Sequence, residues 1–308
     1  VLLKAVELNP LEPVINVNLA ELMASNGDPQ GAREVLQRVL AITPDEPSLL
    51  RSVAVLEMVE RNYLAALRAA RKALAADPQG PANIHAMLDV ELQIEDFDAA
   101  SELARRLPED TRDRQTTLQW IEFRRGSLEM LPQMAALIDE LGRFSSSSSN
   151  TDMLTLGGMI EMRRGNMARA VEWLKQAAGT PEQLESNFEL MNPASLLVVA
   201  LTALGETEQA KRWTQPLLET ADIVIQHERN AVRRHMIEAM AATHRDDSKA
   251  AVAALKAAYE AGYRDRWQVL YDPRLAPLQA NPEMQAMQQR MAEEFAAARE
   301  QAARAGLD

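Results

Sequence analysis

A repeat period of 34 residues is the feature that most constrains how this 308-residue chain can fold. The tetrapeptides ELNP, AITP and AADP end at Pro10, Pro44 and Pro78, at equal intervals. Between these prolines lies a short polar turn, which follows an apolar stretch of helical spacing and precedes a segment with an early alanine. The period therefore predicts a repeating unit made of a helix, a tight turn, a second helix and a proline that ends it.

The turn between the two helices recurs along most of the chain. Its copies are Asn26-Gly27-Asp28, Arg61-Asn62-Tyr63, Glu95-Asp96-Phe97, Arg125-Gly126-Ser127, Arg164-Gly165-Asn166, Leu204-Gly205-Glu206 and Arg245-Asp246-Asp247. Glycine in such a turn accepts the positive φ at the end of the first helix. Because a single helix pair cannot bury its apolar face, the pairs must stack on one another to form a continuous core.

The period and its marks resemble the tetratricopeptide repeat (TPR) family. That family has small residues at the eighth and twentieth positions, an apolar residue at the twenty-fourth, alanine at the twenty-seventh and proline at the thirty-second. The matching residues are Ala20, Ala32, Leu36, Val39 and Pro44 in the repeat from Pro13, Ala54, Ala66, Ala70, Ala73 and Pro78 in the repeat from Pro47, and Gly158, Ala170, Leu174 and Ala177 in the repeat from Thr151. The resemblance implies an all-α, right-handed TPR-like superhelix of about seven helix pairs with a C-terminal capping helix.

Eight residues occur almost identically twice, as WIEFRRGS at 120–127 and as MIEMRRGN at 159–166. Both copies fall at the end of a first helix and in its turn. The glutamate stands where the TPR family usually has tyrosine, and an arginine follows within helical reach. Ion pairs are therefore expected at Glu57–Arg61, Glu122–Arg125 and Glu161–Arg164. An exposed pair contributes a few tenths of a kcal/mol, so the repetition is interpreted as structural.

The repeats become irregular in the middle of the chain. The repeat at 81–111 is short, and the repeat at 112–150 carries the serine-rich segment FSSSSSN. We expect N-terminal TPR-like repeats in 1–144, a serine-rich loop at 145–150, C-terminal repeats in 151–258 and a capping tail in 259–308. A seam near 145–150 would divide two subdomains; one continuous superhelix with a loop is the favoured interpretation, because the same turn recurs on both sides.

The tail leaves the period and ends in a predicted helix. Asn281-Pro282-Glu283 supplies a cap, a proline at the first helical position and an early acid, and the helix is expected to run to about Arg304. The tail resembles the segment that closes TPR arrays in bacterial signalling proteins, including membrane-anchored winged-helix regulators and adenylate-cyclase-type proteins. The matching residues are Asp272-Pro273, Leu275, Pro277-Leu278, Asn281-Pro282 and Met284.

Composition argues against most catalytic and nucleic-acid functions. The chain has no cysteine, and its formal net charge is −12. The histidines His85, His227, His235 and His244 lack the spacing of metal ligands or of a catalytic base, and are interpreted as surface or helix-packing residues. We therefore expect no metal, no cofactor, no enzyme activity, no nucleic acid bound through this region and no membrane span. The first ten residues look like a helix end, so the chain is expected to begin inside a longer protein, in the cytoplasm or the periplasm.

Binding is the remaining route to function. In the TPR family the first helix of each pair lines the concave face, and the alignment places there Val17, Glu21, Arg51, Val55, Met58, His85, Asp89, Trp120, Phe123, Thr155, Met159, Met162 and Val199. Four of these residues would form an apolar strip with two arginines at its rim. The candidate partner-binding residues are Arg51, Met58, His85, Trp120, Phe123, Arg124, Met159, Met162 and Arg163. The alternative is that the register slips by one residue and that the strip belongs to the core.

The resemblance thus implies a protein–protein interaction scaffold that binds a peptide or helix of a partner in its concave groove. The Lys and Asn clamp with which some TPR domains hold a terminal carboxylate is missing, since Val17, Arg51 and His85 occupy its positions. The scaffold would belong to a larger bacterial signalling, regulatory or envelope-assembly protein. A ligand-sensing domain, or a TPR region attached to a cyclase or transferase domain outside this chain, is the alternative, and self-association stays open.

Overall fold

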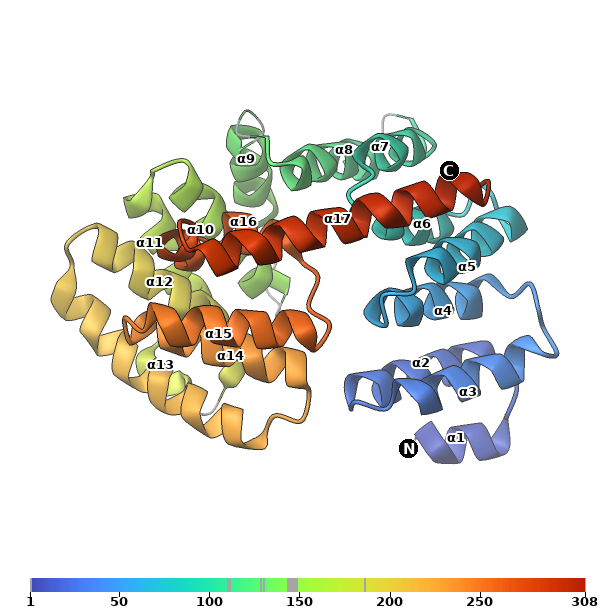
Figure 1. Cartoon of the computed structure of the whole chain (residues 1–308), viewed down its shortest axis with the longest axis horizontal. Helices are drawn as coiled ribbons and strands as arrows, with labels where there is room; N and C mark the ends of the chain where they lie inside the picture. The colour runs from blue at the N-terminus through green and yellow to red at the C-terminus, as the bar shows by residue number, and fades with distance from the viewer. Residues whose placement is uncertain are drawn as a thin grey trace. The chain divides into compact units, whose positions relative to one another are not determined.

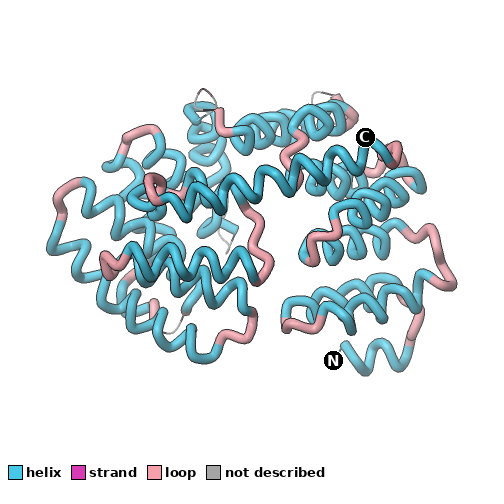
Figure 2. Tube along the Cα trace, viewed as in Figure 1, coloured by secondary structure: helices cyan, strands magenta, loops and turns pink. Residues whose placement is uncertain are grey.

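The computed structural model describes residues 2–109, 112–127, 129, 131–142, 149–185 and 187–307. In this part of the chain every regular element is helical, as predicted (Figure 1 and Figure 2). The helices are α1 (Leu2–Leu8), α2 (Pro13–Ser25), α3 (Pro29–Leu40), α4 (Pro47–Val59), α5 (Tyr63–Ala76), α6 (Pro81–Gln93), α7 (Phe97–Arg105), α8 (Arg112–Arg125), α9 (Leu131–Gly142), α10 (Ser149–Arg163), α11 (Met167–Ala178), η1 (Pro181–Gln183), η2 (Phe188–Leu190), α12 (Met191–Ala203), α13 (Thr207–His227), α14 (Ala231–His244), α15 (Ser248–Glu260), α16 (Arg266–Tyr271), η3 (Pro273–Leu278) and α17 (Pro282–Arg304).

These helices form a series of pairs that begins with α2 and α3 and ends with α14 and α15. Partners pack on each other in α2–α3, α4–α5, α6–α7, α10–α11, α12–α13 and α14–α15, and successive pairs pack in chain order within α2–α7 and within α10–α15. In chain order α8 and α9 take the place of the fourth pair, so the described helices from α2 to α15 make seven successive pairs. The predicted all-α, TPR-like succession of helix pairs with a C-terminal helix is confirmed.

The predicted turns are positions of positive φ. Gly27, Gly126, Gly165 and Gly205 have φ between 76° and 94°. Where the turn has no glycine, Arg61, Glu95 and Asp246 take the same left-handed region, with φ of 64°, 58° and 56°. Residues with a Cβ enter this region at a cost, because the Cβ approaches the following carbonyl oxygen. The fold therefore requires a left-handed backbone at this turn position, whichever residue occupies the position.

Small residues are buried where the two helices of a pair meet. Ala54 and Ala66, at the predicted eighth and twentieth positions, are fully buried. A Cβ added to Gly158 in α10 would lie 2.4 Å from Leu174 Cγ of α11, too close for any real contact. The small side chains thus let the two backbones approach, as the period predicted.

The repeated glutamate pairs with an arginine, as predicted for Glu161–Arg164 and for Glu122–Arg125, and in two repeats it also accepts a bond from the turn asparagine. Glu161 accepts hydrogen bonds from Arg164 Nη1 at 2.6 Å and from Asn166 Nδ2 at 2.7 Å. Glu57 accepts the equivalent bond from Asn62 at 2.8 Å. The predicted partner Arg61 is replaced by Arg33 of the preceding pair, whose Nη2 lies 2.7 Å from Glu57 Oε1. This arrangement corrects the predicted Glu57–Arg61 pair, because Arg61 takes the positive φ of the turn.

The chain divides into two compact units. Unit 1 comprises Val1–Ile121 and Arg290–Asp308, and unit 2 comprises Glu122–Gln289. In unit 1 the last turns of α17 pack on earlier helices: the rings of Phe295 and Tyr63 meet edge to face at 5.9 Å. Most of the serine-rich segment lies outside the described residues, so the predicted division at 145–150 stays a prediction. Among the described helices, none has the length and apolar character needed to cross a bilayer.

Candidate functional site: a covered helix face and a methionine-lined pocket

The predicted groove residues of unit 1 are half-buried and held by neighbouring side chains. Arg51 Nη1 donates a hydrogen bond to Asn83 Oδ1 at 2.6 Å. His85 Nε2 lies 3.2 Å from Asp113. Met58 and Trp120 are also half-buried. These side chains keep some exposed surface on the first helices, so their role in partner binding stays a prediction.

The predicted apolar residues of unit 2 lie in the core. Phe123, Met159 and Met162 expose 0%, 8% and 4% of their surface. Their burial agrees with the alternative interpretation of the sequence, in which these residues belong to the core. These side chains could contact a partner only if the residues that cover them moved away. For Phe123 the cover comes from the tail of the chain.

Two aromatic residues of α16 cover Phe123. The Trp267 ring lies 4.7 Å from the Phe123 ring, and Trp267 Nε1–H donates to the Phe123 carbonyl oxygen at 3.1 Å. Tyr271 packs on Trp267 at 5.7 Å and stands one helical turn further along. A Cβ on Gly126 would lie 2.3 Å from the Tyr271 hydroxyl, so glycine in this turn also leaves room for the tail.

The two predicted rim arginines bind the same tail segment. Arg124 lies 5.6 Å from the Trp267 ring centroid, and its Nη1 lies 3.4 Å from the Asp265 carboxylate. Arg163 lies 4.3 Å from the Tyr271 centroid. Burial lowers the pKa of Arg163, and its Nη1 is a buried atom with no hydrogen-bond partner among the described residues. Ring faces, rather than a carboxylate, hold this cation.

A buried ion pair fixes the tail just beyond α16. Arg274 Nη2 donates to Asp272 Oδ2 at 2.5 Å, and Arg274 Nη1 donates to Asn192 Oδ1 of α12 at 2.9 Å. Burial alone would raise the pKa of Asp272, but the charge and hydrogen bonds of Arg274 outweigh it and lower that pKa. The Asp-Pro-Arg sequence at the start of the closing motif therefore attaches the tail to the first helix of the sixth pair.

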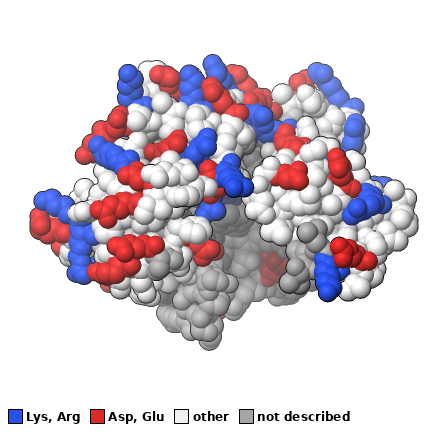
Figure 3. Space-filling model, turned by 90° about the horizontal axis from the view of Figure 1, so that it is seen from below, with Lys and Arg blue, Asp and Glu red and all other residues white. Residues whose placement is uncertain are grey.

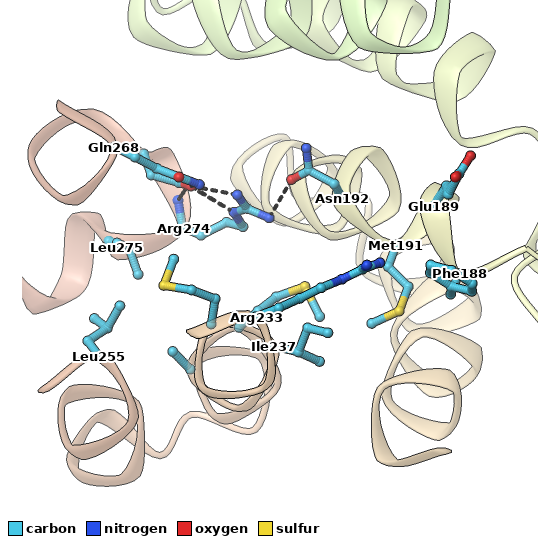
Figure 4. A pocket seen from close by; sticks show the side chains of 14 residues that line it. Phe188, Glu189, Met191, Asn192, Arg233, Ile237, Leu255, Gln268, Arg274 and Leu275 are labelled. Atoms are coloured by element: carbon cyan, nitrogen blue, oxygen red, sulfur yellow. Dashed lines mark hydrogen bonds and ion pairs between the residues drawn. The ribbon is translucent and has the colours of Figure 1, made fainter. Parts of the chain in front are cut away.

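An open pocket lies where this anchored tail meets the first helices of the last two pairs (Figure 4). Its cavity volume is about 230 Å³. Figure 4 shows Leu255 and Leu275 near each other, and Met191 near Phe188. Its walls come from η2, α12, α14, α15, α16 and η3, through Phe188, Glu189, Met191, Asn192, Arg233, Met236, Ile237, Ala239, Met240, Leu255, Gln268, Asp272, Arg274 and Leu275. Most of this lining is apolar, and its polar groups lie toward the ion pair and Arg233.

The pocket has one exposed cation beside an exposed aromatic ring. The Arg233 guanidinium lies 5.0 Å from the Phe188 ring centroid, and its Nε lies 3.3 Å from Glu228. Phe188 exposes 47% of its surface, which is unusual for so large an apolar residue. An apolar cavity with a cation at its mouth suits an apolar group that carries a nearby negative charge.

The predicted groove residues do not include the pocket methionines Met191, Met236 and Met240. The first-helix positions predicted from the repeat end at Val199, before α14 begins. Met236 and Met240 stand four residues apart, so one face of α14 carries both. The four-residue spacing of these methionines could have indicated a shared helix face. The wall supplied by η3 could not be predicted from the repeat, because the tail does not follow the repeat period.

No group in the described residues is arranged as a metal site. Two of the histidines make local contacts: His235 lies 2.7 Å from Glu238, and His227 Nδ1 lies 2.8 Å from the Ile223 carbonyl oxygen. His244 Nε2 lies 2.7 Å from Ser195 Oγ, a hydroxyl that is fully buried. Burial and the charge of Arg274 lower the pKa of His244 to about 4, so the ring is neutral at pH 7.

Comparison with solved structures supports the helical-repeat fold. The chain is similar to a chain of the Cut9–Hcn1 hetero-tetramer of the APC/C, at 13% identity and a TM-score of 0.50, over 94% of this chain and 51% of that one. It thus spans about half the length of that protein. It is also similar to a tetratricopeptide repeat protein from Parabacteroides merdae (14% identity, 89% and 90% covered, TM-score 0.44) and to the apo quorum sensor NprR from B. thuringiensis (13%, 95% and 91%, 0.49). No family model matches the sequence, and no curated protein matches it.

Proposed function

We propose that this chain is a protein-interaction scaffold, and that its methionine-lined pocket takes an apolar side chain from a helix or peptide of a partner. The open apolar cavity on the first helices of unit 2 carries this proposal. Met191, Met236 and Met240 suit such a role because a thioether side chain is unbranched and adapts to ligands of different shape. The exposed ring of Phe188 extends the apolar surface at the mouth.

The charge at the mouth indicates which partner fits. Arg233 is about half exposed and has one carboxylate neighbour, Glu228, at 3.3 Å. A partner carboxylate within one helical turn of the inserted side chain would pair with the remaining guanidinium donors. We therefore propose a partner segment with a large apolar residue next to an acidic one. The groove residues of unit 1, such as Met58 and His85, remain candidates for a second contact.

The pocket also supports a second candidate, a sensor for a small apolar ligand. A cavity of about 230 Å³ is large enough for a compact organic molecule as well as for a side chain. The two candidates differ in the surface that they use outside the cavity. A bound peptide also contacts the exposed surface around Phe188 of η2, whereas a small ligand does not.

A selection of displayed peptides on the whole chain tests the proposal. We expect the enriched peptides to share a large apolar residue beside an acid. The double variant Met236→Gln/Met240→Gln keeps side-chain length but adds amides to the pocket, and we expect it to bind these peptides at least 10-fold more weakly, or about 1.4 kcal/mol. The matched comparison is Met58→Gln in α4 of unit 1, the candidate second contact, which is expected to weaken binding less than the double variant. Peptides that bind the double variant as tightly as the parent chain would rule out the pocket, and loss of binding in Met58→Gln alone would move the site to unit 1.

A further inference from the structure

The segment from Asp265 to Tyr271 is bound to the chain as a short helical ligand would be. Asp265 caps α16, since its carboxylate accepts from Gln268 N at 3.0 Å, and it also faces Arg124 at 3.4 Å. Trp267 and Tyr271 then stand four residues apart, so both rings project from one side of the helix. An acid followed by two aromatic residues at helical spacing meets the ends of α8 and α10.

The receiving side is built by the repeated octet. Arg124 and Arg163 occupy the same place in WIEFRRGS and MIEMRRGN, at the ends of the first helices of two successive pairs. Arg124 lies over Trp267 at 5.6 Å, and Arg163 lies over Tyr271 at 4.3 Å. Arg163 also lies 5.7 Å from the Trp267 centroid, so the two repeats together supply two cations for the two rings of the same ligand helix. A surface that binds one side of a helix in this way is the helix-in-groove type of peptide recognition.

The contacts on the arginines are of a kind that can be exchanged. Arg163 is held by ring faces, and its Nη1 makes no hydrogen bond within the described residues. The Arg124–Asp265 distance of 3.4 Å is longer than a tight charge-assisted hydrogen bond. In contrast, the Asp272–Arg274 pair that follows makes several short bonds and stays buried. The segment is therefore anchored beyond Tyr271 by a charge pair, whereas Trp267 and Tyr271 are held by ring contacts and one indole N–H bond.

We propose that the face formed by Phe123, Arg124 and Arg163 is a recognition site for a partner helix with the pattern acid, one residue, aromatic, three residues, aromatic, and that residues 265–271 occupy it as an internal competitor. This inference goes beyond the proposed function, because Phe123, Arg124 and Arg163 do not line the methionine-lined pocket; the pocket shares only Gln268 with the segment 265–271. A partner with this pattern displaces α16, and the cost of displacement lowers its apparent affinity.

A labelled peptide with the sequence YRDRWQVLYDP, residues 263–273, tests the site in the whole chain. We expect saturable binding to the variant Trp267→Ala/Tyr271→Ala, in which the internal segment has lost both rings. Wild type is expected to bind at least about 10-fold more weakly, since its own segment competes at high effective concentration. A peptide with both aromatic residues changed to alanine is expected not to bind. If the native peptide shows no saturable binding to the folded variant, the proposal is wrong.

Further substitutions, added to the Trp267→Ala/Tyr271→Ala variant, show whether Arg124 and Arg163 bind the peptide. Arg124→Ala/Arg163→Ala is expected to abolish binding, whereas Arg125→Ala, which removes a neighbouring arginine that pairs with Glu122, is expected to leave it unchanged. Met236→Gln/Met240→Gln is also expected to leave it unchanged, which separates this site from the pocket. Equal binding with and without the two arginines would overturn the assignment.

Removal of a buried indole can unfold the chain, so a second variant accompanies the first. Trp267→Phe/Tyr271→Phe keeps an aromatic ring at each position and removes the indole N–H bond to Phe123. The peptide is expected to raise the melting temperature of this variant and not that of wild type; no change in either would count against the proposal. If wild type sediments as a dimer that the peptide disperses, the occupant is a second copy of the chain, which would overturn the assignment to a partner protein.

Discussion

At the residue scale, His244 shows how one buried contact gives the chain a dependence on pH. Its ring is hydrogen-bonded to the fully buried Ser195. Burial and then the charge of Arg274 lower its pKa, while Asp246 and Asp272 oppose this shift. The pKa is about 4 in the folded chain and about 6.5 in an unfolded one. Because the unfolded state takes up the proton first, stability is fully present above pH 6.5 and falls as the pH decreases towards 4.

We expect His244 to remove about 2 kcal/mol of unfolding free energy between pH 7 and pH 5. Urea unfolding of wild type and of His244→Asn at both pH values measures this contribution as a difference. The variant keeps a polar group near Ser195 and all other histidines, so carboxylate titration cancels in the comparison. A loss that is equal in both proteins would show that another group is responsible.

Residue-scale burial also separates the two sides of the doubled octet, whose repetition was interpreted as structural. Phe123 and Met162 occupy the same place in the two copies, and both are buried. Their arginine neighbours Arg124 and Arg163 keep partial exposure and bind the tail. One motif therefore contributes apolar side chains to the core and arginine side chains to the surface that contacts the tail.

At the element scale, a charge pair that water hardly reaches lies within the tail, and its arginine donates a hydrogen bond to Asn192 of α12. The side chains of Arg274 and Asp272 are 9% and 2% exposed. Removal of one partner from such a pair leaves an uncompensated buried charge, whereas replacement of both by apolar groups is often neutral. The pair therefore decides whether the tail stays docked beside the methionine-lined pocket.

We expect Asp272→Asn to lower the unfolding free energy by about 3–5 kcal/mol, because Arg274 is then buried without its counter-charge. Asp272→Asn/Arg274→Met is expected to recover most of this loss. Chemical unfolding measures both variants. The control is Lys211→Ala, which breaks the exposed pair with Glu208 and is expected to change stability by less than about 1 kcal/mol. A double variant no better than the single one would contradict the charge argument.

At the scale of the whole molecule, the charge balance governs which macromolecules are attracted. The formal net charge is −12. On the face drawn in Figure 3, lysine and arginine side chains are interspersed with aspartate and glutamate side chains. A surface that binds phosphates needs clustered cations, so neither the sum nor the distribution on this face favours nucleic acid.

We therefore expect no binding of a short DNA duplex by the chain, even at about 50 mM salt, where phosphate contacts are strongest. Fluorescence anisotropy of a labelled duplex measures this directly. Binding that weakens steeply as salt rises would reveal a basic surface outside the face in Figure 3 and would overturn the expectation.

The sequence by itself determined the helix pairs, their turns and the close approach within each pair. These features recur with a period because each pair meets the same neighbours, so Ala66, Gly158 and the left-handed turn at Gly165 could be placed in advance. The ion-pair partner of Glu57 could not be predicted in this way. It is decided by the turn conformation of Arg61 and by the approach of Arg33 from the preceding pair.

Only the tertiary structure decided which first-helix surfaces are open. Trp267 meets Phe123 across 144 residues of sequence, and a contact that occurs once leaves no periodic mark. The tail therefore covers the predicted apolar strip at Phe123 and also supplies the wall that turns the methionines of α14 into a pocket. Periodic patterns encode contacts between neighbouring repeats, whereas the docking of a non-repetitive tail depends on the three-dimensional surface those repeats have already formed.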